Sequence, residues 1–184
     1  MADQAQPSTE SAQAGQPVDQ QTHFEIERFM VREARLLDQD RLHEWLELLA
    51  PDIRYQLPVQ EVRYRKDTQP IGSATGTYIF DDDYKLLEMR VNRMDTNLVW
   101  FEDPKTSSRR LITNIDAEWS QQAGEIDAYS TFLTYRNRRQ SDETWLVGAR
   151  EDRLRKTDQG WRLVNRVILL DQRVVQDKNL HLFL

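Results

Sequence analysis

The chain of 184 residues contains no cysteine. Without a thiol it cannot form a disulfide, a thiolate zinc site or a cysteine nucleophile. It also cannot hold an iron–sulfur cluster by itself, because the ligands of such clusters include cysteines. Thiol chemistry and cluster chemistry are therefore excluded for this polypeptide.

Histidine is scarce as well, and the three histidines are His23, His43 and His181. None belongs to a close ligand pair such as HExxH. A facial triad would need His23 and His181 to meet from opposite ends of the chain, and we do not expect it. No GxGxxG, GxSxG or phosphate-loop motif is present, and Gly72 and Gly76 fit an ordinary loop. We expect no catalytic, cofactor-binding or metal-binding residue here.

Positive charge is in deficit, with 25 Lys and Arg against 31 Asp and Glu, a net charge of −6 and a pI of about 5.2. Nucleic acid is then an unexpected partner, because binding phosphates requires a positive field. The one basic cluster, residues 136–140, is too short to alter this expectation.

Long apolar runs are also missing, and none approaches the roughly 20 residues of a membrane-spanning helix. The first residues have neither a basic start nor an apolar stretch, so they do not form a signal peptide. We expect no membrane contact and a cytoplasmic location.

The remaining composition, 39% hydrophobic and 30% charged residues, is typical of a soluble globular protein. Residues 1–21 are rich in Gln, Ala, Ser and Pro and bury too little apolar area to offset their ordering entropy. The sequence therefore predicts a flexible tail at residues 1–21 and a single domain at residues 22–184.

Three helices are predicted from apolar spacing. The first runs from Phe24 with Thr22 as its cap, and its stripe includes Ile26, Phe29, Met30, Glu33 and Leu37. The second carries Leu42, Trp45, Leu46 and Leu49 on one face and ends at Pro51. The third follows Asp81–Asp83, which supply its cap, and continues to Met94.

Strands make up the rest. An extended segment begins at Asp52, and Pro58 indicates an edge or a bulge there. Residues 66–79 are predicted as a loop. Four long strands then form an antiparallel meander, with turns at Gly124 and Gly160. The order of helices and strands along the chain predicts an α+β fold. In this fold a strongly curved, cone-shaped sheet wraps around the N-terminal helices.

The first meander strand shows a regular alternation. It predicts Leu111, Thr113, Ile115, Ala117 and Trp119 on the helix-covered face, and Ile112, Asn114, Asp116 and Glu118 on the other. A lone carboxylate in an apolar pocket can act as a base, and Asp116 and Tyr129 are candidates for such work in an open cone. The alternation, however, points Asp116 away from the helices.

The last strand is apolar on both faces, because Ile168 and Leu170 accompany Val167 and Leu169. The chain then ends in NLHLFL, although termini are usually polar. Two explanations stay open: the end folds back onto its own sheet, or another subunit covers it.

Arginines on the neighbouring strands suit interface ion pairs, although cross-strand pairs on a solvated face are the commoner explanation of such a pattern. The candidate subunit-interface residues are Arg150, Arg153, Arg155, Arg162, Arg166, Ile168, Leu170, Asp171, Leu182, Phe183 and Leu184.

Several separated blocks agree with one known family in order and spacing. They are REARLLDQDRLHEWLELLAPDIRYQLP (residues 32–58), DDDYKLLEMRVNRMDTNLVWFEDPKTSSRRLITNI (81–115), YRNRR, LVGAREDRLR, RVILLDQ and KNLHLFL. Over residues 24–184 the chain resembles the small (beta) subunit of Rieske-type aromatic-ring-hydroxylating dioxygenases.

The resemblance implies an NTF2-like (cystatin-like) fold and an assembly of three small and three large (alpha) subunits. The large subunit would carry a Rieske [2Fe–2S] cluster and mononuclear Fe(II), with electrons from NADH through a reductase and often a ferredoxin. The product would be an arene cis-dihydrodiol. The small subunit would be mainly structural and would trimerise.

An alternative remains from the residues alone: a stand-alone isomerase or dehydratase of the same fold, with a carboxylate in the cone. The type of arene, whether benzene, biphenyl, naphthalene or a carboxylated ring, is not predicted.

Overall fold

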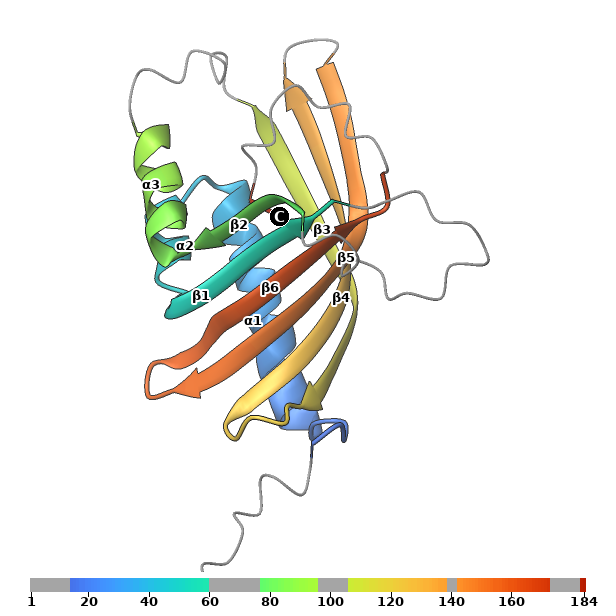
Figure 1. The fold of residues 1–184 in the computed structure, drawn as a ribbon. Coiled ribbons are helices and arrows are strands. Elements are labelled where there is room, and N and C mark those ends of the chain that lie inside the picture. The colour runs from blue at the N-terminus through green and yellow to red at the C-terminus, as the bar shows by residue number, and fades with distance from the viewer. Residues whose placement is uncertain (1–13, 60–76, 96–105, 139–141, 173–182) are drawn as a thin grey trace, which may run out of the picture.

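Helices and a single sheet form the part of the chain that the computed structural model describes, residues 14–59, 77–95, 106–138, 142–172 and 183–184. The elements are α1 (Gln20–Asp38), α2 (Leu42–Leu46), β1 (Leu49–Pro58), β2 (Tyr78–Asp83), α3 (Tyr84–Met94), β3 (Ser107–Trp119), β4 (Glu125–Arg138), β5 (Asp142–Thr157) and β6 (Gly160–Leu170). The curved sheet has α1 behind it, while α2 and α3 lie toward the β1–β2 end (Figure 1).

The strand order is β2-β1-β6-β5-β4-β3. The predicted meander from β3 to β6 is confirmed, and β1 joins β6 in parallel, so the sheet is mixed. Strand β2 was not predicted, since residues 66–79 read as a loop. It has no apolar alternation, and Asp82 is its one buried side chain.

Helix α1 begins two residues before the predicted cap. Asp19, not Thr22, is the N-cap: its carboxylate accepts a hydrogen bond from the Thr22 backbone N–H at 3.1 Å and another from the Thr22 hydroxyl. Just before it, Gly15 and Val18 donate main-chain hydrogen bonds to the end of β3. These contacts hold residues 15–18, within the predicted tail, against the sheet. Residues 1–13 lie outside the described ranges.

Helix α2 is shorter than predicted. It ends at Leu46, and Leu49 is already the first residue of β1. Pro51 therefore lies inside β1 and does not end the helix. The predicted irregularity at Pro58 is confirmed, because the register with β2 shifts there, although β1 is an internal strand.

The predicted alternation along β3 is wrong for its first half. The register with β4 shifts between Thr113 and Asp116, and Asn114 takes a positive φ of 51°. This extra residue, a β-bulge, exchanges the two faces of the strand. Ala117 is buried as predicted, whereas Leu111 is exposed and the buried side chain before the bulge is Arg110.

A second bulge explains the two apolar faces of β6. Asn165 pairs with Arg153 and Leu163 with Leu154, so Val164 is an extra residue between them. Trp161 and Leu163 face the core before it, and Arg166, Ile168 and Leu170 face the core after it. The strand is apolar on both faces because its inward face changes midway.

Gly148 marks a close approach of β5 to β6. A Cβ at this position would lie 2.2 Å from the carbonyl oxygen of Leu169, which is rigid backbone. Glycine is the residue that permits such an approach.

We expect Gly148→Ala to lower the free energy of unfolding by about 1–3 kcal/mol or more, because the methyl forces the strands apart. Ala149→Val, on the half-buried opposite face of β5, is the control and should change stability by less than about 0.5 kcal/mol. Urea unfolding measures both. A Gly148→Ala protein as stable as the control would contradict the close approach.

Candidate functional site

Aromatic side chains fill the interior of the cone. Trp45 contacts Tyr55 edge-on with ring centroids 6.2 Å apart, and Phe183 packs on Trp45 at 4.5 Å. These rings and Phe132 are all buried. Together with the aliphatic side chains of the core they pack against the inner face of the sheet.

A buried ion cluster joins α1 to the sheet. The Arg166 guanidinium donates to both oxygens of Glu33 at 2.7 and 2.8 Å, and to both oxygens of Asp152 at 2.7 Å. Glu33 also accepts a hydrogen bond from the Trp45 indole at 3.0 Å. All three charged groups are at most 3% exposed. The guanidinium binds each carboxylate through two hydrogen bonds, and this bidentate geometry compensates buried charges best.

Arg150 completes the charge balance of the cluster. Its Nη1 lies 3.6 Å from Glu33, and its guanidinium stacks 5.0 Å from the Phe132 ring centroid. Burial, with the repulsion of Arg166, lowers the pKa of Arg150 to about 10, so it stays charged at neutral pH. Two of its nitrogens, Nε and Nη2, have no hydrogen-bond partner in the described ranges.

Glu33 is unsuited to act as a base. Burial alone would raise the pKa of its carboxyl, but the charges of Arg166 and Arg150 and the hydrogen bonds of Arg166 and Trp45 outweigh burial and lower the pKa below 4.5. A general base works best with a pKa near the operating pH. Glu33 therefore does not support the isomerase alternative.

The last two residues are bound inside the cone. Arg110 donates to the Phe183 carbonyl oxygen from Nε at 3.2 Å and from Nη2 at 2.8 Å. Arg166 donates to the Leu184 main-chain oxygen at 3.1 Å, and the Tyr55 hydroxyl bonds both the oxygen and the N–H of Leu184. Phe183 and Leu184 therefore fold back onto the chain's own sheet, as one of the two explanations left open by the sequence predicts (Figure 1). Residues 173–182 lie outside the described ranges.

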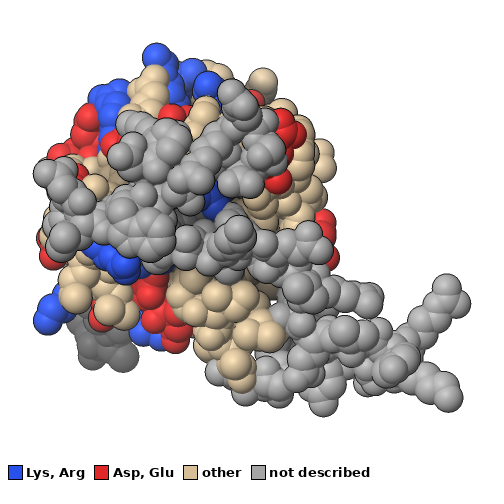
Figure 2. Space-filling view, turned by 90° about the horizontal axis from the view of Figure 1, so that it is seen from above, with Lys and Arg blue, Asp and Glu red and all other residues tan. Residues whose placement is uncertain are grey.

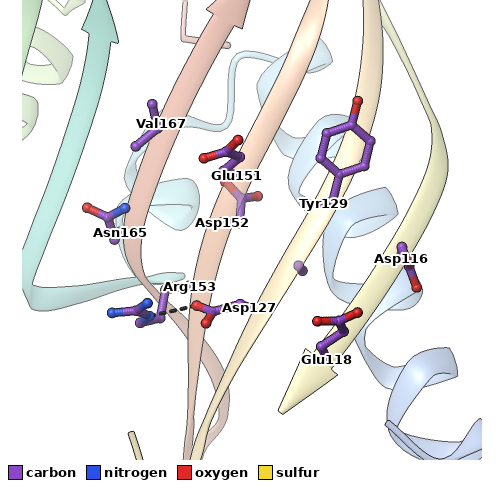
Figure 3. Close-up of a pocket in the computed structure, with 10 residues that line it drawn as sticks. Asp116, Glu118, Asp127, Tyr129, Glu151, Asp152, Arg153, Asn165 and Val167 are labelled. Carbon is purple, nitrogen blue, oxygen red and sulfur yellow. Dashed lines mark hydrogen bonds and ion pairs between the residues drawn. The ribbon is translucent and has the colours of Figure 1, made fainter. Parts of the chain in front are cut away.

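The predicted acid–base pair lies on the opposite face of the sheet. Asp116 and Tyr129 line an outer depression of about 480 Å³ together with Glu118, Glu151 and Arg153 (Figure 3). Asp116 is exposed and Tyr129 is 46% exposed, as expected for the face away from the helices. Asp116 and Tyr129 are cross-strand neighbours, but they lie in an open, acidic hollow and not in an apolar pocket.

Six of the predicted interface residues have no free surface, because this chain's own core covers them: Arg150, Arg166, Ile168, Leu170, Phe183 and Leu184. These six side chains face inward in the single chain, and their place at a subunit interface stays a prediction.

The interface prediction also stays open for the other predicted residues within the described ranges. Arg153 and Arg155 are partly exposed but paired within the chain, with Asp127 and with Asp52 and Glu125. Arg162 is half-buried and Asp171 exposed. Leu182 lies outside the described ranges.

The described residues do not fit a metal ion, and a chain without cysteine does not fit a Rieske cluster. The sequence has no cysteine, and the described ranges hold no group of three His, Cys, Asp or Glu residues able to bind a metal ion. His23 bonds the Ile115 carbonyl oxygen at 3.2 Å and His43 pairs with Asp95 at 2.7 Å. His181 is not among the described residues.

Charge on the surface is mixed. Basic and acidic side chains are interspersed over the described part of the side seen in Figure 2. Of the helices in the described ranges, none has the length and apolar character needed to cross a bilayer.

Comparison with known proteins points to one family. A family model described as the ring hydroxylating beta subunit matches residues 32–177. The chlorobenzene dioxygenase subunit beta of Cupriavidus sp. is 36% identical over 170 residues, 91% of each chain.

Solved structures show the same fold. A chain of naphthalene 1,2-dioxygenase superimposes with a TM-score of 0.81 at 24% identity, covering 94% of this chain and 91% of that one. A protein from Nostoc punctiforme with a cystatin-like fold superimposes with a TM-score of 0.55 at 16% identity over 84% of this chain and 95% of that one. The predicted NTF2-like α+β fold is confirmed.

We predict that Glu33→Gln lowers the free energy of unfolding by about 3 kcal/mol or more, because Arg166 and Arg150 lose the charge that compensates them. The pH dependence should change too. The folded-state pKa of Glu33 lies below its ordinary value of 4.5, so its contribution is present above about pH 4.5 and is lost as pH falls through the folded pKa.

Urea unfolding between pH 3 and pH 7 (roughly the carboxyl titration range) measures this effect. The variant should lose less stability on acidification than the wild type. Glu27→Gln, exposed on the same helix, is the matched control and should follow the wild-type curve. Parallel curves for all three proteins would refute the role of Glu33.

We expect Phe183→Ala to lower the free energy of unfolding by about 3–5 kcal/mol, because the lost ring leaves a cavity against Trp45. Phe24→Ala, at a 55% exposed position, should change stability by less than about 0.5 kcal/mol. Thermal or urea unfolding of both variants makes the comparison, and equal small effects would show that the chain end is not anchored in the core.

Proposed function

Because the chain belongs to the ring-hydroxylating dioxygenase beta subunit family, we propose that it is the non-catalytic subunit of a cytoplasmic arene dioxygenase. In this role it forms a trimer of small subunits that holds three catalytic large subunits in register. The complex dihydroxylates an aromatic ring in cis with O2, using electrons from NADH delivered through a reductase and a ferredoxin.

The family match over residues 32–177 carries this proposal. The filled cone supports it, since Trp45, Tyr55 and Phe183 occupy the space in which a substrate would otherwise sit. The chain also lacks the cysteines of a Rieske centre. The redox chemistry then belongs to the large subunit, and this chain contributes assembly.

Expression of the chain alone and with its large subunit tests the proposal. Alone, the 21.9 kDa chain should run in light-scattering chromatography at three times its monomer mass and oxidise no arene. With the large subunit it should co-purify, and omitting it should abolish arene oxidation. A chain that stays monomeric in both preparations, with full arene oxidation in its absence, would refute the role.

A further inference from the structure

A groove of about 680 Å³ runs between α1 and the β5–β6 turn. One wall is the solvent-facing side of α1, and the other is the turn from Gln159 to Arg162 with Glu47 and Leu48 behind it. Four arginines line it, Arg28, Arg32, Arg35 and Arg162, and we call it the arginine groove. It is separate from the outer depression, which lies on the other face of the sheet.

The arginines of α1 are not neutralised. Arg28, Arg32 and Arg35 are exposed and form no ion pair or hydrogen bond through their side chains among the described residues. Arg32 acts on Glu44 only through space, and Glu44 is already paired with Arg41.

The carboxylates nearby do not cancel this charge. Of the two that line the groove, Glu25 is engaged by Trp161 at 3.0 Å and Lys156 at 3.1 Å, which leaves Glu47. Arg162 donates to the neutral Gln159 oxygen at 2.7 Å. The groove is a locally cationic surface on a chain whose net charge is −6.

Apolar side chains stand between these charges. Phe24 is 55% exposed and Val31 is 47% exposed, and both line the groove. With Arg28, Arg32 and Arg35 they fall at positions i, i+4, i+7, i+8 and i+11, which is one stripe of the helix. Aromatic residues and arginines are the types enriched in the energetic centres of protein interfaces.

We propose that the arginine groove is the docking site for a segment of the catalytic large subunit that presents carboxylates beside an apolar side chain. This inference rests on the proposed function. The guanidinium forks would bind the carboxylates, and the apolar side chain would cover Phe24 and Val31. Complementary charge of this kind orients two partners and speeds their encounter.

The fold argues against a second copy of this chain in the groove. An acidic surface that could meet the arginines is the outer depression, and α1 lies on the opposite side of the sheet (Figures 1 and 3). Contacts between opposite faces of identical copies are head-to-tail, and they close a ring only where the rotation from one copy to the next adds up to a full turn. A different polypeptide meets no such requirement, so it is the occupant that we propose.

The test uses the complete chain and its large subunit. We expect the double variant Arg28→Glu/Arg32→Glu to bind the large subunit about tenfold or more weakly in surface plasmon resonance, with a shallower salt dependence. The control Lys85→Glu reverses an exposed charge on α3 and should bind as the wild type does. All three proteins should have the same melting temperature and the same oligomeric mass on their own.

Each possible result of this experiment supports or overturns the docking site. Weaker binding by the double variant alone supports the docking site. If the wild type and both variants bind the large subunit equally, the docking site is wrong and the proposed function stands. If the double variant loses its own oligomeric state and keeps its affinity for the large subunit, the occupant is a second copy and the proposal is overturned. A wild-type chain that never binds the large subunit overturns both proposals.

Discussion

The pairing of Glu33 with Arg166 is the constraint on which the inner layer of this protein depends. It places a carboxylate of α1 against an arginine of β6, and Asp152 of β5 holds the same arginine from its other side. Moving such charges out of water costs several kcal/mol per ion unless each is paired. The helix packs on the sheet in the register that brings all partners together, so that each of these buried charges faces an opposite one.

The same cluster determines what the cone can contain. Arg166 has a donor left after binding two carboxylates, and that donor holds the Leu184 oxygen. Arg110, paired with Asp38 of α1 at 2.8 Å, holds the Phe183 carbonyl oxygen. The end of the chain thus accepts hydrogen bonds from Arg110 and Arg166 and brings the Phe183 ring onto Trp45. In the described part of the cone, these side chains and the end of the chain occupy the interior as core.

Much of the fold can be predicted from the periodicity of apolar residues. The wrong predictions lie where the structure departs from a regular period. The apolar stripe of α1 and the β3–β6 meander were predicted correctly, because many residues repeat one pattern. The two bulges, at Asn114 and Val164, each insert one residue and exchange the faces of a strand, and a strict period of two cannot show this. Strand β2 was not predicted because its own sequence has no strand pattern. It is a strand because it pairs with β1.

The buried charges were missed for a different reason. Arginines alternating with acids along β5 are typical of a solvated face, and Arg153 and Arg155 fit that description, whereas Arg150 and Asp152 point inward. One signal was present: Glu33 lies within the apolar stripe of α1. A carboxylate at that position requires a buried cation, and Arg150 and Arg166 are the cations that the facing strands supply.

The burial of the inner face leaves the described apolar surface elsewhere. Ile168, Leu170 and the last two residues belong to the core of this chain, whereas parts of the helices and of the outer face of the sheet are exposed. That face is not uniformly polar: Leu111 and Trp145 are each 54% exposed, and Trp145 packs on Tyr135 at 4.7 Å. The bulge at Asn114 is what turns Leu111 outward. The residue inserted at Asn114, which made the predicted alternation wrong, therefore also determines which apolar side chains of β3 the outer face exposes.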